Sequence, residues 1–171
     1  MKLVKYLFYG FERLVVKLGR WKYIPNSKDK MIYIVPHKYK GDDFKLPDGT
    51  IIKSGDRVIE LHVDNLKTDK IDNDYKTLFK VFKNELKALK KASKDNESFS
   101  NIKAFHGTTV LYPICKRQGF SIYNLDEGIN TFFLKIWDNI LRIVFRKNKL
   151  KRKTLRIPKE CWISKKNLSD L

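Results

Sequence analysis

The chain has 171 residues, of which 42% are hydrophobic and 13% aromatic, a composition that fits one domain with its own core and excludes a disordered chain. Its formal charge is +18, from 37 basic and 19 acidic residues, so we expect polyanionic partners such as anionic lipid, phosphate-bearing glycan or nucleic acid. Cys115 and Cys161 stand far apart without metal-binding spacing, which excludes a disulfide scaffold and predicts two buried thiols.

Residues 1–22 are predicted to form a basic amphipathic helix. Leucines and Phe11 recur at helical spacing, and Gly19 suits the end of a helix. Glu12 and Arg13 interrupt the apolar run before it is long enough for a signal peptide or a membrane-spanning helix, and no cleavage site follows. The sequence therefore predicts a cytoplasmic protein, either soluble or peripheral at the membrane.

Short strands are predicted next. Residues 31–35 (MIYIV) form a β-branched run that Pro36 is expected to close, and Pro47-Asp48-Gly49 predicts a turn. We expect residues 50–64 to form an antiparallel hairpin around a tight turn at Ser54-Gly55-Asp56. One face of its second strand, made of Ile59, Leu61 and Val63, should pack against helices.

Helices and strands alternate in the second half. Helical spacing runs from Tyr75 to Leu89, with Asp72 or Asp74 as the cap. Residues 102–125 predict a strand or turn, a helix that Thr108 or Thr109 caps and Gly119 ends, and another strand. Residues 129–147 predict a mostly apolar helix, and a strand at ECWIS precedes a short polar helix. The pattern predicts a single α+β domain, residues 1–171, with a small, mostly antiparallel sheet and a central hairpin packed against three or four helices.

Glu60, His62 and Asp64 occupy alternate positions of one predicted strand and therefore share a face. Such a row can bind zinc or manganese, can use a carboxylate to orient a general-base imidazole, or can be the solvated face of a sheet. We expect direct contact between Glu60 and His62 to be strained, because neighbours two apart lie about 7 Å from each other along a strand. Their partners should then come from other strands.

A second candidate is the stretch His106-Gly107-Thr108-Thr109, where a helix start could hold an anion or could simply be capped. His37, beside Lys38 and Lys40, is interpreted as a surface loop residue. No Gly-x-Ser-x-Gly sequence, Cys/His cluster or dinucleotide fingerprint occurs, so neither a metal nor another cofactor is predicted.

The basic excess lies mostly at the two ends of the chain, beside the two most apolar predicted helices. This arrangement suits a protein that rests on an anionic membrane surface. Nucleic acid would use the same charge, but no helix-turn-helix, zinc-finger or RNA-recognition signature is present. A lysine-rich genome would also raise the number of basic residues without giving them a function. The residues predicted to form a membrane or polyanion surface are Lys2, Lys5, Arg13, Lys17, Arg142, Arg146, Lys147, Lys149, Lys151, Arg152 and Lys153.

Three segments resemble the YkoP-like domain family: LPDGTIIKSGDRVIELHVDN, KAFHGTTVLYPICKRQGFSIYNL and PKECWISKKNL. They lie in a family-like core that covers most of residues 30–168, and the most telling match runs from Gly55 to Asn65. The family is a small domain found alone or attached to polysaccharide deacetylases in Gram-positive bacteria. The resemblance therefore implies cell-envelope glycan metabolism without naming a reaction. His106 stands where the family pattern leads us to expect an aromatic or aliphatic residue.

These observations lead to an accessory binding domain at the cytoplasmic membrane face, which recognises an anionic or lipid-linked glycan intermediate or an envelope enzyme that handles one. A small transferase or hydrolase that uses Glu60 and His62 is the first alternative, and a nucleic-acid-binding module is the second. Because the resemblance is concentrated in polar positions that folding alone does not require, we interpret the Glu60 row as a binding site. The expected ligand-binding residues are Arg57, Glu60, His62, Asp64, Asn65, His106 and Thr108.

Overall fold

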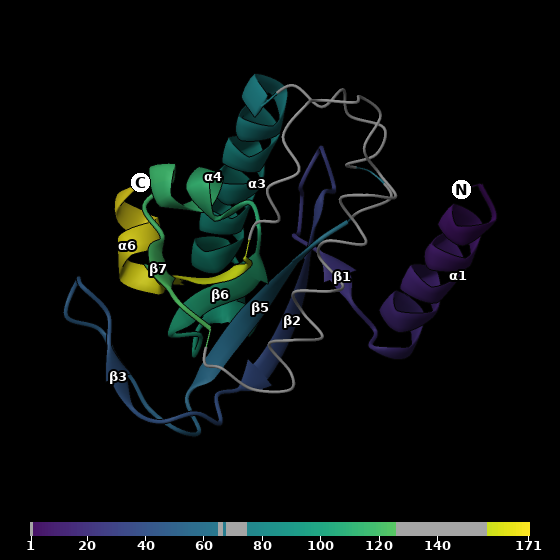
Figure 1. The fold of residues 1–171 in the computed structure, drawn as a ribbon. Coiled ribbons are helices and arrows are strands. Elements are labelled where there is room, and N and C mark those ends of the chain that lie inside the picture. The colour runs from purple at the N-terminus through teal and green to yellow at the C-terminus, as the bar shows by residue number, and fades with distance from the viewer. Residues whose placement is uncertain (1, 65–66, 68–74, 126–156) are drawn as a thin grey trace.

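The computed structural model describes residues 2–64, 67, 75–125 and 157–171, which build an α+β domain around one six-stranded sheet (Figure 1). All neighbouring strands are antiparallel except β5 and β6, so the sheet is mostly antiparallel, as predicted. In spatial order the strands are β1 (Lys22–Tyr23), β2 (Ile32–Lys38), β5 (Arg57–Val63), β6 (Ala104–Thr109), β8 (Lys159–Ser164) and β7 (Ser121–Tyr123).

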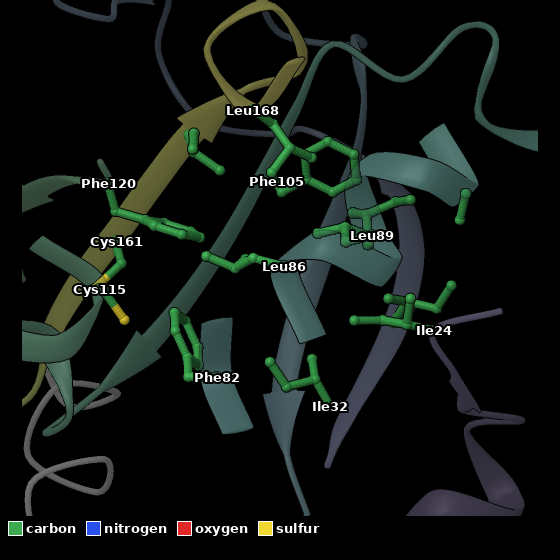
Figure 2. Packing of buried hydrophobic residues seen from close by; sticks show 14 of the residues in the cluster. Ile24, Ile32, Phe82, Leu86, Leu89, Phe105, Cys115, Phe120, Cys161 and Leu168 are labelled. Atoms are coloured by element: carbon green, nitrogen blue, oxygen red, sulfur yellow. The ribbon is translucent and has the colours of Figure 1, made fainter. Parts of the chain in front are cut away.

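Three helices and a short 3-10 turn cover one face of the sheet. They are α3 (Tyr75–Asp95), α4 (Tyr112–Arg117), α6 (Lys165–Asp170) and η1 (Glu97–Phe99). Figure 2 shows how α3 inserts Phe82, Leu86 and Leu89 between side chains of the strands, among them Ile32 and Phe105. The predicted packing of the Ile59 and Leu61 face on helices is confirmed, since Ile59 is buried in this cluster and Leu61 packs against it. Both cysteines are buried here with free thiols, also as predicted.

The opposite face is partly covered by a small two-stranded sheet, β3 (Phe44–Lys45) and β4 (Ile51–Ile52). It buries a second, smaller cluster made of Leu46, Ile52, Val58, Ala104 and Trp162. The turn between β3 and β4 is fixed to the main sheet by Asp48, which accepts a hydrogen bond from the Ser164 hydroxyl and two more from Thr50. Among the described residues, polar side chains of β2, β5, β6 and β8 also lie on this face.

The predicted hairpin over residues 50–64 is wrong, although its turn exists. Asp56 N–H donates to the Lys53 carbonyl, which closes a tight turn. The turn then bonds to the end of β2, because Gly55 N–H donates to the Tyr39 carbonyl and Tyr39 N–H donates to the Asp56 carbonyl. Ile51 and Ile52 instead pair with β3, to which the Pro47-Asp48-Gly49 turn connects them. The short strand thus has a turn on each side, and it forms its hairpin with the first one. The antiparallel partner of β5 is β2, from Ile32 opposite Val63 to Lys38 opposite Arg57.

Two predicted boundaries also need correction. Pro36 does not end its strand, since β2 continues to Lys38. The missing N–H of Pro36 costs no hydrogen bond of the sheet, because β1 pairs only with Tyr33 and Ile34 and does not extend as far as Pro36. The helix before Gly119 begins at Tyr112 rather than after a threonine cap, since Thr108 and Thr109 belong to β6. The helix from Tyr75, the strand at ECWIS and the final helix are confirmed.

Helix α1 (Lys2–Leu18) stands beside the β1 edge and apart from the helices that cover the sheet (Figure 1). Leu14 is 52% exposed and Leu18 74% exposed, and each directly follows an exposed basic residue, Arg13 and Lys17. None of the helices that the structure describes is long and apolar enough to cross a membrane. The predicted helix over residues 129–147 and the caps at Asp72 or Asp74 lie outside the described residues.

Candidate functional site

The sheet face opposite the helices carries five titratable side chains that we call the polar face: His37, Glu60, His62, His106 and Glu160. The strand registers bring them together, because Glu60 lies beside His106 in the parallel pair and His37 lies opposite Val58, two residues from Glu60. On the far side of β6, Trp162 pairs with His106 and Glu160 pairs with Thr108. Cross-strand partners point to the same side of a sheet, so four strands contribute to one surface.

His62 and Glu60 form the first half of the polar face. The His62 Nε2 atom lies 3.4 Å from the Glu60 Oε2 atom, and both side chains are partly exposed, at 28% and 36%. The expectation that this contact would be too strained is wrong, because the long glutamate side chain leans along the strand to reach the ring. Trp21 stacks on the face of the imidazole ring, with ring centres 4.1 Å apart and planes inclined by only 16°.

The Glu60 carboxylate is held in its ionised form. Burial raises the pKa of Glu60, but the hydrogen bond from His62 and the charges of His62, His106 and His37 outweigh it, so the pKa lies below its usual value. An ionised carboxylate accepts hydrogen bonds and cannot donate one. At neutral pH, Glu60 can therefore accept a hydrogen bond from a hydroxyl group of a bound molecule, or it can coordinate a cation.

His37, His106 and Glu160 form the second half. The Nε2 atoms of His37 and His106 lie 3.3 Å apart, with ring centres separated by 5.1 Å. The other ring nitrogen of His106, Nδ1, lies 3.6 Å from Glu160 Oε1, and Nδ1 of His37 lies 3.3 Å from the Val35 carbonyl oxygen. Both imidazoles thus have their Nδ1 atoms turned to an acceptor and their Nε2 atoms turned to each other.

The buried Trp162 fixes the position of His106. Its ring stacks on the imidazole with centres 4.2 Å apart and an angle of 11° between the planes. Phe44 and Tyr39 pack edge-on against Trp162 and hold it from the other side. The His106 side chain is consequently 12% exposed, the least accessible of the paired histidines and carboxylates on this face.

Asp64 ends the row at the β1 edge and is not free to bind a ligand. It is buried, and its Oδ2 atom accepts hydrogen bonds from Tyr23 Oη at 2.6 Å and Tyr33 Oη at 3.2 Å. Its Oδ1 atom accepts from the Lys67 N–H. Burial, followed by the hydrogen bond to Asp64, raises the pKa of Tyr23, so this tyrosine remains a donor. Asp64 therefore orients the tyrosines beside His62 and Trp21.

Of the residues predicted to bind ligand, the structure brings together Glu60, His62, His106 and Thr108. His106 and Thr108 lie on β6 rather than at a helix start, so an anion site made from a helix N-terminus is excluded there. Arg57 is exposed at the start of β5, in alternation with Ile59 and not with Glu60, and does not belong to the polar face. Asn65 lies outside the described residues.

The predicted membrane surface is described only at its N-terminal end. Lys2, Lys5, Arg13 and Lys17 lie on α1, where the side chains of Arg13 and Lys17 are exposed. The basic residues from Arg142 to Lys153 lie outside the described residues.

Sequence reasoning missed His37, Glu160, Trp21 and Trp162. His37 was interpreted as a loop residue because Pro36 was expected to end the strand, and the same alternation that selected Glu60 would have placed it with Tyr33 and Val35. No local pattern marked Glu160 or the tryptophans, because strands and a loop distant in sequence bring them to the site. Among the described residues, no three or more His, Cys, Asp or Glu side chains could hold a metal ion as they stand.

A model of the YkoP domain family matches residues 1–171, so the chain belongs to that family. No curated protein and no solved structure shows a significant match to the chain.

Proposed function

We propose that the protein is a binding domain for an anionic or lipid-linked sugar, which it recognises with the polar face while α1 rests on an anionic membrane surface. The observation that carries the proposal is the convergence of three imidazoles and two carboxylates from four strands on the sheet face opposite the described helices α3, α4 and α6. Sugar hydroxyls both donate and accept hydrogen bonds, and this set of side chains offers both kinds of partner. The cell-envelope setting comes from the family resemblance alone.

The membrane part is supported by α1. A helix that packs into a core buries its apolar stripe, whereas Leu14 and Leu18 are more than half exposed beside exposed Arg13 and Lys17. An apolar stripe with basic neighbours is what an interfacial helix uses. Each basic residue near an anionic surface contributes about 1 kcal/mol, so adsorption should depend on lipid charge and weaken with salt.

Sugar recognition is tested by titrating the protein with N-acetylglucosamine 1-phosphate, free N-acetylglucosamine and inorganic phosphate, with isothermal calorimetry as the readout. We expect the sugar phosphate to bind, and His62→Ala to abolish binding while the melting temperature stays within a few degrees. Arg57→Ala is the matched control, because it removes a charge from the same strand outside the polar face and should leave binding unchanged. Failure of all three probes, or equal loss in both variants, would contradict the proposal.

Membrane binding is tested by co-sedimentation with phosphatidylglycerol vesicles and with neutral phosphatidylcholine vesicles. Leu14→Asn should reduce binding to the anionic vesicles, whereas Ile51→Thr, which removes a comparably exposed apolar side chain from β4, should not. Equal binding to both vesicle types, or to neither, counts against the membrane part. A duplex DNA titration separates the nucleic-acid alternative, which requires binding that tracks duplex length and falls steeply with salt.

An enzymatic role is the second candidate, and the Glu60–His62 contact favours it. A carboxylate that holds an imidazole in place is the usual arrangement of a general base. The arrangement suits a transferase or hydrolase that removes a proton from a sugar hydroxyl or from water. Turnover of the bound sugar phosphate that His62→Gln eliminates, without loss of binding, would identify an enzyme.

A further inference from the structure

We propose that His37 and His106 are two ligands of a zinc-type divalent metal ion, with the Glu60 carboxylate as the third ligand and the fourth position open to water or substrate. The proposal does not rest on sugar binding, because it concerns the histidine pair and can be tested with the metal ion alone. It rests on three features of the second half of the polar face: where the ring protons must lie, how far the rings are separated, and what stands behind each ring.

The surroundings of the two Nδ1 atoms favour rings that carry their protons there. The Val35 carbonyl oxygen can only accept, so the hydrogen bond to it places a hydrogen on His37 Nδ1, and the contact of 3.6 Å between His106 Nδ1 and the Glu160 carboxylate favours a hydrogen on that nitrogen as well. Neutral rings of this tautomer have bare lone pairs on Nε2. The two Nε2 atoms face each other at 3.3 Å, so in this tautomer they repel unless a shared proton or a metal ion lies between them.

The separation of the rings fits a metal ion. With zinc–nitrogen distances of about 2.05 Å, two nitrogen atoms 3.3 Å apart subtend about 107° at the ion, close to the tetrahedral angle. If both lone pairs point at that ion, the ring centres should lie about 5.1 Å apart. The observed separation is 5.1 Å, whereas a straight N–H···N hydrogen bond would set the centres about 5.6 Å apart.

The surroundings of both histidines match those of metal ligands. A metal-binding histidine almost always donates its second N–H to a carboxylate or a backbone carbonyl, which orients the ring and makes it a better donor to the metal. Glu160 occupies this position behind His106, and the Val35 carbonyl occupies it behind His37. Trp162 holds the His106 ring in place by stacking.

Glu60 is the available third ligand. It lies beside His106 in the strand register, on the same face of the sheet as both histidines. Its carboxylate now contacts His62, so it reaches the ion by rotation of its own side chain, and only two ligands are preset by the strands. Two nitrogen atoms and one carboxylate favour zinc over magnesium or calcium, which prefer oxygen ligands.

The test uses the untagged full-length chain, freed of metal by dialysis against a chelator and titrated with zinc ions in a calorimeter. We expect one ion per chain, and cobalt(II) in its place should give the visible absorption of a tetrahedral site. His37→Ala should weaken zinc binding by more than the hundredfold or so that outer-shell changes reach, and Glu160→Gln by about tenfold to a hundredfold. The matched control is Arg57→Ala, which removes a charged side chain from β5 outside the polar face and should leave zinc binding within a few fold.

Circular dichroism of each variant shows whether it is folded, and His37→Ala decides the matter because His37 is not stacked on the buried Trp162. A wild-type chain that shows no saturable zinc binding would overturn the proposal. The two rings would then share a proton and not a metal ion. Binding that survives in His37→Ala, or that disappears equally in Arg57→Ala, would also overturn it. Zinc binding without sugar binding, or the reverse, separates this proposal from the proposed function.

Discussion

Gly107 directly follows His106 of the polar face, and replacing it with alanine should both destabilise the fold and displace the site. A Cβ atom at position 107 would lie 2.6 Å from the Leu61 carbonyl oxygen, well inside van der Waals contact. That oxygen belongs to the backbone of β5 and cannot swing away as a flexible side chain would. Relief therefore requires β5 and β6 to move apart, although they pair only from Val58 to Glu60.

The expected cost is that of overpacking a tight interior, about 1–3 kcal/mol. For a chain of this size each 1 kcal/mol lowers the melting temperature by about 2–4 °C, so Gly107→Ala should melt about 2–12 °C below the wild type. Moving β6 also moves His106 away from its partners on β2 and β5, so zinc binding should weaken even where the variant is folded.

Thermal melting followed by circular dichroism, together with the zinc titration, measures both effects. Gly10→Ala is the matched control, since nothing lies within 4 Å of the added Cβ and alanine in a helix is favoured over glycine by about 0.5–1 kcal/mol. A Gly107→Ala variant that melts like the wild type would refute the reasoning, because the strands would then have absorbed the contact without moving.

Three further changes test what holds the polar face in place. Ser164→Ala removes the bond that caps α6 at the Asn167 N–H and the bond to Asp48, and should cost about 1–2 kcal/mol in urea unfolding; an unchanged midpoint would argue against the cap. Burial raises the pKa of Asp48, but hydrogen bonds from Ser164 and Thr50 outweigh this effect and lower the pKa below 3.8. The stability that the Asp48 charge contributes is therefore present above pH 3.8 and is lost as the pH falls through the lowered pKa. The stability difference between wild type and Asp48→Asn should therefore shrink in acid, and a constant difference would show that the charge is irrelevant. Leu89→Ala should cost about 2–5 kcal/mol because the side chain is fully buried, and a cost near zero would place α3 outside the core.

Local patterns predicted most of the elements. Apolar residues at helical spacing predicted α1 and α3. A β-branched run predicted β2, and the segment ECWIS predicted β8. These signals could be recognised because they depend on residues only a few positions apart. The errors arose where two local signals competed or where distant pairing decided. Ile51 and Ile52 stood between two good turns, and only the burial of Ile52 against Trp162 shows which turn formed the hairpin.

The site was half predictable for the same reason. The alternation of Glu60 and His62 is visible in the sequence, and it correctly placed them on one face opposite Ile59 and Leu61. Their neighbours are distant in sequence: His37 is more than twenty residues away and Glu160 about a hundred. Only the strand order β2-β5-β6-β8 brings these residues together. A single sequence carries no information on that order.

The two parts of the proposed function are physically connected through Trp21. Helix α1 ends at Leu18, and the chain folds back at once: Gly19 N–H and Trp21 N–H donate to the carbonyls of Val15 and Val16. A side chain at Gly19 would collide with the Trp21 ring, so glycine permits this close return. Trp21 is thereby fixed to the end of α1 while it stacks on His62.

Three residue steps of extended chain span at most about 10 Å, and the hydrogen bonds shorten the path from Leu18 to Trp21 further. An interfacial helix buries its apolar side about 5–10 Å into the boundary between headgroups and acyl chains. A helix α1 adsorbed in this way would therefore hold His62 close to the headgroup layer, where the phosphate and first sugar of a lipid-linked glycan are found. Membrane adsorption and recognition by the polar face would then act on the same molecule, since the link between them is too short to let the two operate apart.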